Sequence, residues 1–334
     1  MSNDERVSGG TASIAVSRGT VSNSYVSGFG RLRILFLILR LLPFALRQAT
    51  KRQFFVNIPE VDYEIPGERL KPRMRMLVWS IMYAMLLRTY TDSARTHLRR
   101  GSQHVLFLMV DLIKGLDDSL DGLGSLSESD ALASPLFVTQ KDYLSRYLRL
   151  SGSSQPVVSF LKNRFSANYA TYIEHLRVAR ETRSFEDVLK VIEIDSLWLT
   201  YVMEVVAIYN GPRVTEEARA DYYRLGVVGK FADDMYDAPQ DFLTNDVNLL
   251  LSLAKEHGLD QQRLAAAVAE GCRIDLARWR AKCQTAINDY YDHVESFVRA
   301  VRSPRVRLIC DLVVGRAVVG RSGKHDVVPG VPSE

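Results

Sequence analysis

Apolar residues recur along this chain at helical spacing, and no stretch keeps the alternation of apolar and polar residues that a strand would need. Helix-compatible apolar runs cover Val105 to Leu116 and Tyr223 to Ala232. We therefore predict an all-α protein, a single-domain helical bundle whose functional side chains project into its interior. Further helical stretches are expected over Thr139 to Tyr209, with a break at Gly152 to Pro156, and over Gln261 to Ala286, Asp289 to Arg299 and Arg305 to Val319.

The two ends of the chain lack this periodicity. Residues 1–30 are rich in Ser, Gly and Val, and we expect a disordered leader there. Residues 320–334 are expected to form a disordered tail, which leaves residues 31–319 as the helical domain.

Residues 31–47 (RLRILFLILRLLPFALR) are the most apolar segment. Arg40 interrupts the run and Pro43 follows it, so the uninterrupted apolar stretch is shorter than the roughly 20 residues of a spanning helix. Three interpretations stay open: a core helix, an interfacial helix in peripheral contact with a membrane, and a targeting remnant.

Composition narrows the classes of function. The chain has 334 residues, 47% hydrophobic and 25% charged, which is ordinary for a soluble globular protein. Its net charge of +4 is small for this size, and no basic stripe interleaved with aromatics is present, so we expect no nucleic-acid partner. Cys272, Cys283 and Cys310 lack metal-ligand spacing, and we expect free thiols in a reducing cytoplasm.

Two aspartate-rich motifs carry the candidate chemistry: Asp117-Asp118-Ser119-Leu120-Asp121 and Asp233-Asp234-Met235-Tyr236-Asp237. In each motif the first and last aspartates share one helix face, one turn apart. Such carboxylates repel one another unless a cation neutralises them, and Mg2+ is bound by carboxylates together with substrate phosphates. The two motifs predict a diphosphate clamp, with metal ligands at Asp117, Asp118, Asp121, Asp233, Asp234 and Asp237.

Local signals around the second motif set its helix boundaries. Asn210-Gly211-Pro212 should stop the preceding helix, and Thr215 should cap the next one. Pro239 follows the motif, so this helix should end or kink immediately after Asp237.

Two other polar sites are less specific. The basic cluster of residues 68–75, which includes Arg69 and Lys71, opens a predicted helix, where cations beside free amides could receive a phosphate or could be surface charge. Asp195-Ser196 lies between apolar stretches and could face a cavity or form a satisfied core pair.

These residues resemble the trans-isoprenyl diphosphate synthases and the related class I terpene synthases. Gly226, seven residues before Asp233, and the later segment 246–250 are similar to the family's second aspartate-rich region. Residues 117–121 resemble the first aspartate-rich motif, and residues 67–72 resemble the element that holds isopentenyl diphosphate.

The resemblance implies an isoprenoid-synthase fold with a central active-site cavity, a homodimer and a prenyl diphosphate substrate. It implies that Asp117, Asp121, Asp233 and Asp237 are catalytic and surround three Mg2+ ions, which neutralise the charge developing on the leaving diphosphate. Lys230, Arg69 and Lys71 would bind the diphosphate. Candidate liners of the cavity are Trp198, Tyr201, Tyr209 and Phe231, although core packing is the commoner explanation for any one of them.

The chain departs from the elongating members of this family. Glu68 stands where those members have a lysine, and no arginine pair follows Asp121. Lys230 occupies the usual glutamine position, and Ile194-Asp195 stands where those members have Lys-Thr. These changes weaken the second-substrate site and leave the ionisation site whole.

The expected function is therefore that of a terpene synthase, which ionises one linear prenyl diphosphate and cyclises or quenches the carbocation. Leu112 and Ile113 lie five and four residues before Asp117, where short-chain elongating members of the family often have aromatic residues that close the cavity. The resemblance therefore implies that these aliphatic residues leave room for farnesyl or longer chains. One alternative is a prenyltransferase that joins an allylic diphosphate to isopentenyl diphosphate or another acceptor. A non-catalytic subunit of a prenyl synthase is the other alternative, although it would not need intact aspartates.

Overall fold

The computed structural model describes residues 83–123, 132–150, 154–269 and 283–319. These residues form helices and connecting turns, and they contain no strand, which confirms the all-α prediction for this part of the chain. The leader, residues 31–47, Arg69, Lys71 and the tail lie outside the described residues.

A helix over residues 83–93 opens the described part of the chain. The elements that follow are α3 (Ser102–Leu123), α5 (Pro135–Leu150), α6 (Ser154–Phe160), the π-helix η1 (Leu161–Phe165), α7 (Ser166–Thr182), α8 (Phe185–Asp195), α9 (Leu197–Asn210), α10 (Glu216–Thr244), α11 (Leu249–Glu256), α12 (Gly258–Ala269), α14 (Gln284–Ala300) and α15 (Pro304–Val319).

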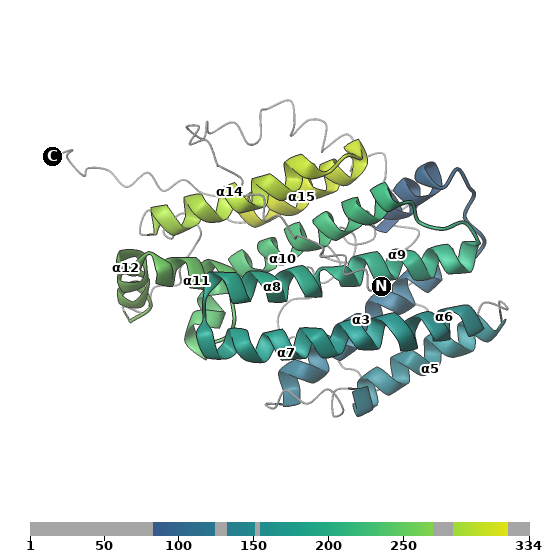
Figure 1. The fold of residues 1–334 in the computed structure, drawn as a ribbon, viewed down its shortest axis with the longest axis horizontal. Helices are drawn as coiled ribbons and strands as arrows, with labels where there is room; N and C mark the ends of the chain where they lie inside the picture. Colours follow the sequence, from purple (N-terminus) through teal and green to yellow (C-terminus); the bar gives the residue numbers. More distant parts are fainter. Residues whose placement is uncertain (1–82, 124–131, 151–153, 270–282, 320–334) are drawn as a thin grey trace, which may run out of the picture.

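Helix α9 is the centre of the bundle. It lies between α3 on one side and α10 on the other (Figure 1). Its sequence is apolar nearly all round, as expected of a helix with no solvent-facing side. Val202, Val205 and Val206 have no exposed surface, and the burial of such side chains stabilises this part of the fold.

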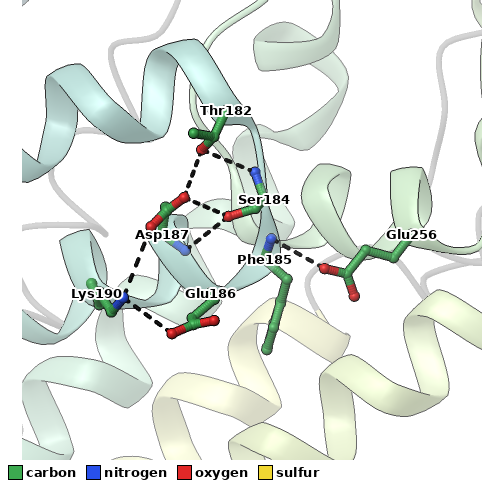
Figure 2. A network of polar contacts seen from close by, with 7 residues as sticks. All are labelled: Thr182, Ser184, Phe185, Glu186, Asp187, Lys190 and Glu256. Atoms are coloured by element: carbon green, nitrogen blue, oxygen red, sulfur yellow. Dashed lines mark hydrogen bonds and ion pairs between the residues drawn. The ribbon is translucent and has the colours of Figure 1, made fainter.

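The break predicted at Gly152 to Pro156 does not extend to Pro156, because α6 already includes residues 154–156, and residues 151–153 lie outside the described residues. Further on, the helical stretch predicted up to Tyr209 is interrupted between α7 and α8 and between α8 and α9. Figure 2 shows the polar network at the break between α7 and α8. Ser184 is the N-cap of α8: its Oγ accepts a hydrogen bond from Asp187 N at 3.2 Å and donates one to Asp187 Oδ2 at 2.7 Å. Thr182 Oγ1 donates to the same carboxylate at 2.8 Å. Such capping ends α7 and starts α8 at a defined residue.

Helix α10 begins as predicted and ends later than predicted. Thr215 Oγ1 accepts the Ala218 N–H at 3.2 Å, which confirms the cap. The expected end at Asp237 is wrong, because α10 continues through Pro239 to Thr244. Proline removes one backbone donor, but contacts beyond it hold the last turn: Asn248 Nδ2 donates to Asp241 Oδ2 at 2.7 Å.

The C-terminal helices follow the prediction with shifted boundaries. The stretch predicted from Gln261 appears as α12, although residues 270–282 lie outside the described residues. Helix α14 starts at Gln284 instead of Asp289, since the carboxylate of Asp260 accepts the Ala286 N–H at 2.9 Å. Helix α15 matches the predicted stretch, and the short α11 was not predicted as a helix.

Two smaller expectations concern the thiols and the membrane. Cys283 and Cys310 are buried free thiols, as predicted, and Cys272 lies outside the described residues. Among the helices that the structure describes, none has the length and apolar character to cross a membrane.

Candidate functional site

The helices that carry the two aspartate motifs run in the same direction. Helix α3 begins where α9 ends, because Asn210 Oδ1 accepts hydrogen bonds from Arg99 N at 2.8 Å and Ser102 Oγ at 2.9 Å. Helix α10 starts from the turn that follows α9 and passes the start of α9, where Gly226 meets Ser196. Both helices are therefore antiparallel to α9 and parallel to each other.

Helix geometry then gives the height of each motif, that is, its position along the direction of α9. At 1.5 Å per residue, α3 rises about 28 Å from Ser102 to Asp121. The path back along α9 to Ser196 is about 21 Å, and the path from Gly226 on to Asp233 adds about 10 Å. The backbone positions of Asp121 and Asp233 thus lie at about the same height, beyond the start of α9.

Four positions of α10 form one face at this end of the bundle: Gly226, Lys230, Asp233 and Asp237 follow one another at helical spacing. Asp233 is exposed and Asp237 is partly exposed. The Lys230 ammonium lies 2.6 Å from the carboxylate of Asp195. The last residue of α8 thus contributes a charge to the same end as the motif.

The break between α8 and α9 is shaped by these neighbours. Asn168 Nδ2, from α7, donates to the carbonyl of Ile194 at 3.3 Å, and Ser196 Oγ donates to the carbonyl of Ile192. Asp195 is paired with Lys230. Both residues of the Asp195-Ser196 pair therefore have polar partners, although only Ser196 is buried and Asp195 is partly exposed.

Gly226 allows α10 to approach this break. A Cβ atom at position 226 would overlap the carbonyl oxygen of Ser196 and lie 3.1 Å from its carbonyl carbon. Only a residue without a side chain fits such a contact with backbone. The glycine thereby brings Lys230, one turn further on, within reach of Asp195.

Asp234, the second residue of the second motif, points toward α11. Its Oδ2 accepts the Leu249 N–H at 2.6 Å, and its backbone carbonyl accepts Asn248 Nδ2 at 2.7 Å. Asn248 is itself the N-cap of α11. In this geometry Asp234 fastens α11 to α10, and its expected role as a metal ligand stays a prediction.

Burial raises the pKa of Asp234 to about 8, although the Leu249 N–H and Lys230 favour the carboxylate. The folded-state pKa lies above the unfolded value, so the contribution of Asp234 to stability is present in acid and is lost as the pH rises toward 8.

We expect Asp234→Asn to remove this pH dependence. Its amide oxygen can still accept the Leu249 N–H, and it cannot ionise. The free energy of unfolding, measured with EDTA present from pH 5 to pH 9, should fall less with rising pH in the variant than in the wild type. Parallel pH curves for the two proteins would contradict the assignment.

The other expected site residues are described to different extents. Asp117, Asp118 and Asp121 lie in the last turns of α3, and their side chains are outside the described set. Leu112 is a core residue, 1% exposed, whereas Ile113 is partly buried.

The expected cavity liners prove to differ in burial. Phe231 has no exposed surface and packs edge-on against Tyr290, and the Tyr209 hydroxyl donates to the Arg100 carbonyl at 2.7 Å. Core packing accounts for these two residues, through apolar contact for Phe231 and a backbone acceptor for Tyr209, and their role as cavity liners stays a prediction. Trp198 and Tyr201 are partly buried and pack against the core around α9.

The α10 carboxylates fit a hard cation in their chemistry. Asp233 and Asp237 lie one turn apart, and Mg2+ typically takes one or two carboxylates and completes its shell with substrate phosphates and water. Within the side chains that the structure describes, no three His, Cys, Asp or Glu residues form a group that could hold a metal by themselves. The first motif on α3 is expected to supply further protein ligands.

Comparisons with known proteins add no family to this geometry: no family model, no curated protein and no solved structure matches the chain. The fold and the site define a class, namely an all-α protein with two parallel, aspartate-bearing helices on either side of a buried central helix.

Proposed function

We propose that the protein is a class I terpene synthase that ionises a linear prenyl diphosphate of farnesyl length or longer and releases diphosphate. The observation that carries this proposal is the parallel course of α3 and α10, which bring two Asp-Asp-x-x-Asp motifs to one end of the bundle at about equal height. A single motif of this kind is common on solvated helices, whereas a diphosphate clamp requires two motifs at the same end of the bundle.

The aspartates would bind the diphosphate through metal ions. Asp233 and Asp237 would repel a diphosphate on their own, so they bind it through Mg2+, together with Asp117 and Asp121 of α3. When bound, the metal supplies positive charge that stabilises the leaving diphosphate.

Lys230 is the cation closest to the second motif along the α10 face. A lysine ammonium has three donors, so Lys230 can hold Asp195 and a phosphate oxygen at the same time. The ion pair orients the ammonium toward the motif and reduces the rotamer entropy that would otherwise be lost on binding.

The interior behind the site favours an apolar chain. The core around α3 and α9 is built from aliphatic and aromatic side chains, with Leu106, Met109 and Val202 fully buried. Apolar surroundings exclude water, which protects a carbocation from premature capture.

The proposal is tested by incubating the purified protein with geranyl, farnesyl and geranylgeranyl diphosphates, each with and without isopentenyl diphosphate, in Mg2+ and in EDTA. We expect a terpene hydrocarbon or alcohol and inorganic diphosphate, formed from farnesyl or a longer substrate, without isopentenyl diphosphate and in Mg2+ only. Mass spectrometry of the organic extract identifies the product.

Consumption of isopentenyl diphosphate with accumulation of a longer linear diphosphate would assign the prenyltransferase function instead. Absence of turnover with every substrate would contradict both enzymatic proposals.

A further inference from the structure

Arginines gather at the end of the bundle opposite the aspartates. We use "basic pole" for Arg95, Arg99, Arg100, Arg213 and Arg302, all of which are exposed. They come from three segments: the loop before α3, the turn between α9 and α10, and the turn between α14 and α15.

Hydrogen bonds and an ion pair hold these three segments together. The Tyr90 hydroxyl donates to the Pro212 carbonyl at 2.8 Å, which joins the helix over residues 83–93 to the α9–α10 turn. Arg305, at the start of α15, pairs with Asp92. The basic pole is therefore one surface formed by segments far apart in the sequence.

The backbone beneath the arginines is fixed by buried acceptors. Asn210, 5% exposed, accepts the Arg99 N–H, and the hydroxyl of Tyr209 donates to the Arg100 carbonyl. Asp221, 2% exposed, accepts the N–H groups of Arg302 at 2.9 Å and Ser303 at 2.7 Å. The backbone that carries these arginines is thus preorganised, and the Arg99 guanidinium is held against it by donating to the Tyr209 carbonyl at 3.2 Å.

The cations of the basic pole are not neutralised by neighbouring acids. Asp92 is shared by Arg88 and Arg305, and Glu216 pairs with Arg219. Within the part of the chain that the structure describes, no carboxylate forms an ion pair with Arg95, Arg99, Arg100, Arg213 or Arg302. Like charges held close together repel one another, so contact with an extended anionic surface lowers the free energy of the basic pole.

An exposed apolar residue identifies the kind of anionic surface. Leu98, 36% exposed, lies between His97 and Arg99 on the same loop. A single-stranded nucleic acid is typically bound by large aromatic side chains that stack on its bases, and the loop over residues 94–101 has no Phe, Tyr or Trp. A leucine among arginines fits the headgroup region of a bilayer, which accepts cations at its surface and apolar side chains just below it.

We propose that the basic pole docks the protein on the surface of an anionic phospholipid bilayer, with Leu98 inserted at the headgroup level. This inference is independent of the proposed function. In the docked orientation the aspartate motifs lie at the end of the bundle away from the bilayer.

The test is sedimentation of the full chain with sucrose-loaded vesicles, either of phosphatidylcholine alone or with a phosphatidylserine fraction, at low and at high salt. Each surface cation contributes about a fivefold factor in binding, so Arg95→Gln, Arg100→Gln and Arg213→Gln together should weaken binding to anionic vesicles by on the order of a hundredfold. Leu98→Ser should weaken it further, with a loss that persists at high salt.

The matched control neutralises three exposed cations at the other end of the bundle, on α7, α11 and α12: Arg177→Gln, Lys255→Gln and Arg263→Gln. It should bind nearly as the wild type does. The proposal is overturned if the wild type does not sediment with anionic vesicles, if the basic-pole variant binds as tightly as the wild type, or if the control variant loses binding equally. Binding of an RNA oligonucleotide in place of vesicles, with the same loss in the variant, would also overturn it.

Discussion

Replacement of Asp233 by Ala is expected to reduce turnover by several orders of magnitude and to leave the fold intact. Within the residues that the structure describes, the exposed Asp233 carboxylate forms no hydrogen bond or ion pair, and its replacement removes a proposed ligand of the Mg2+ that would stabilise the leaving diphosphate. Asp117→Ala should have the same effect, since the proposal assigns it the equivalent role on α3. The measurement is steady-state turnover of farnesyl or geranylgeranyl diphosphate, with circular dichroism to verify helicity.

A control separates this effect from a general loss of surface charge. Asp142 is an exposed aspartate on α5, distant from both motifs along the chain, and Asp142→Ala should keep full activity. Near-normal turnover of both Asp117→Ala and Asp233→Ala, or full activity of the wild type in EDTA, would disprove the clamp.

Gly226→Ala is expected to destabilise the protein strongly for a change of one methyl group. The new Cβ would overlap the backbone carbonyl oxygen of Ser196, and backbone at a helix junction cannot move aside as a side chain can. Overpacking of this kind costs roughly 1–3 kcal/mol, and we expect the upper end of that range in the free energy of unfolding. Urea denaturation followed by circular dichroism measures the change.

Gly229 provides the matched control on the same helix. A Cβ there meets no atom within 4 Å, so Gly229→Ala adds only helix propensity and should stabilise the protein by about 0.5–1 kcal/mol. Opposite signs for the two variants would support the close contact between α10 and the start of α9. If Gly226→Ala were as stable as Gly229→Ala, the contact would be wrong.

Helices of this protein could be predicted wherever the controlling signal is local. Thr215 as a cap and the apolar runs of α3 and α10 are read directly from neighbouring residues. The break at Ser196 has no such signal, because neither Asp195 nor Ser196 is a strong helix breaker. It depends on Asn168 and Gly226, which belong to other helices.

At Pro239 a local signal was present, and it gave a wrong prediction. Its local effect predicts the end of a helix, yet α10 continues because Asn248 holds Asp241 one turn beyond it. The loss of one backbone hydrogen bond is offset by contacts that no local rule includes.

The candidate site was predictable in part. The spacing of Asp233 and Asp237 within one motif identifies their shared helix face. The ion pair between Lys230 and Asp195 was not predicted, although both positions differ from the family pattern, because pairing across two helices requires their relative register. Asp234 likewise has the residue type of a metal ligand, and only its contact with Leu249 indicates a structural role.

The close contact at Gly226 also constrains which insertions and deletions this protein can tolerate. One residue inserted between Gly226 and Asp233 would rotate the second motif by about 100° around α10 and advance it by about 1.5 Å, while the contact with Ser196 stayed in place. The aspartates would then leave the face that they share with Lys230. An insertion of the same length in the α9–α10 turn, before the contact, would leave that face unchanged. Length variation in this part of the chain should therefore be confined to the turn.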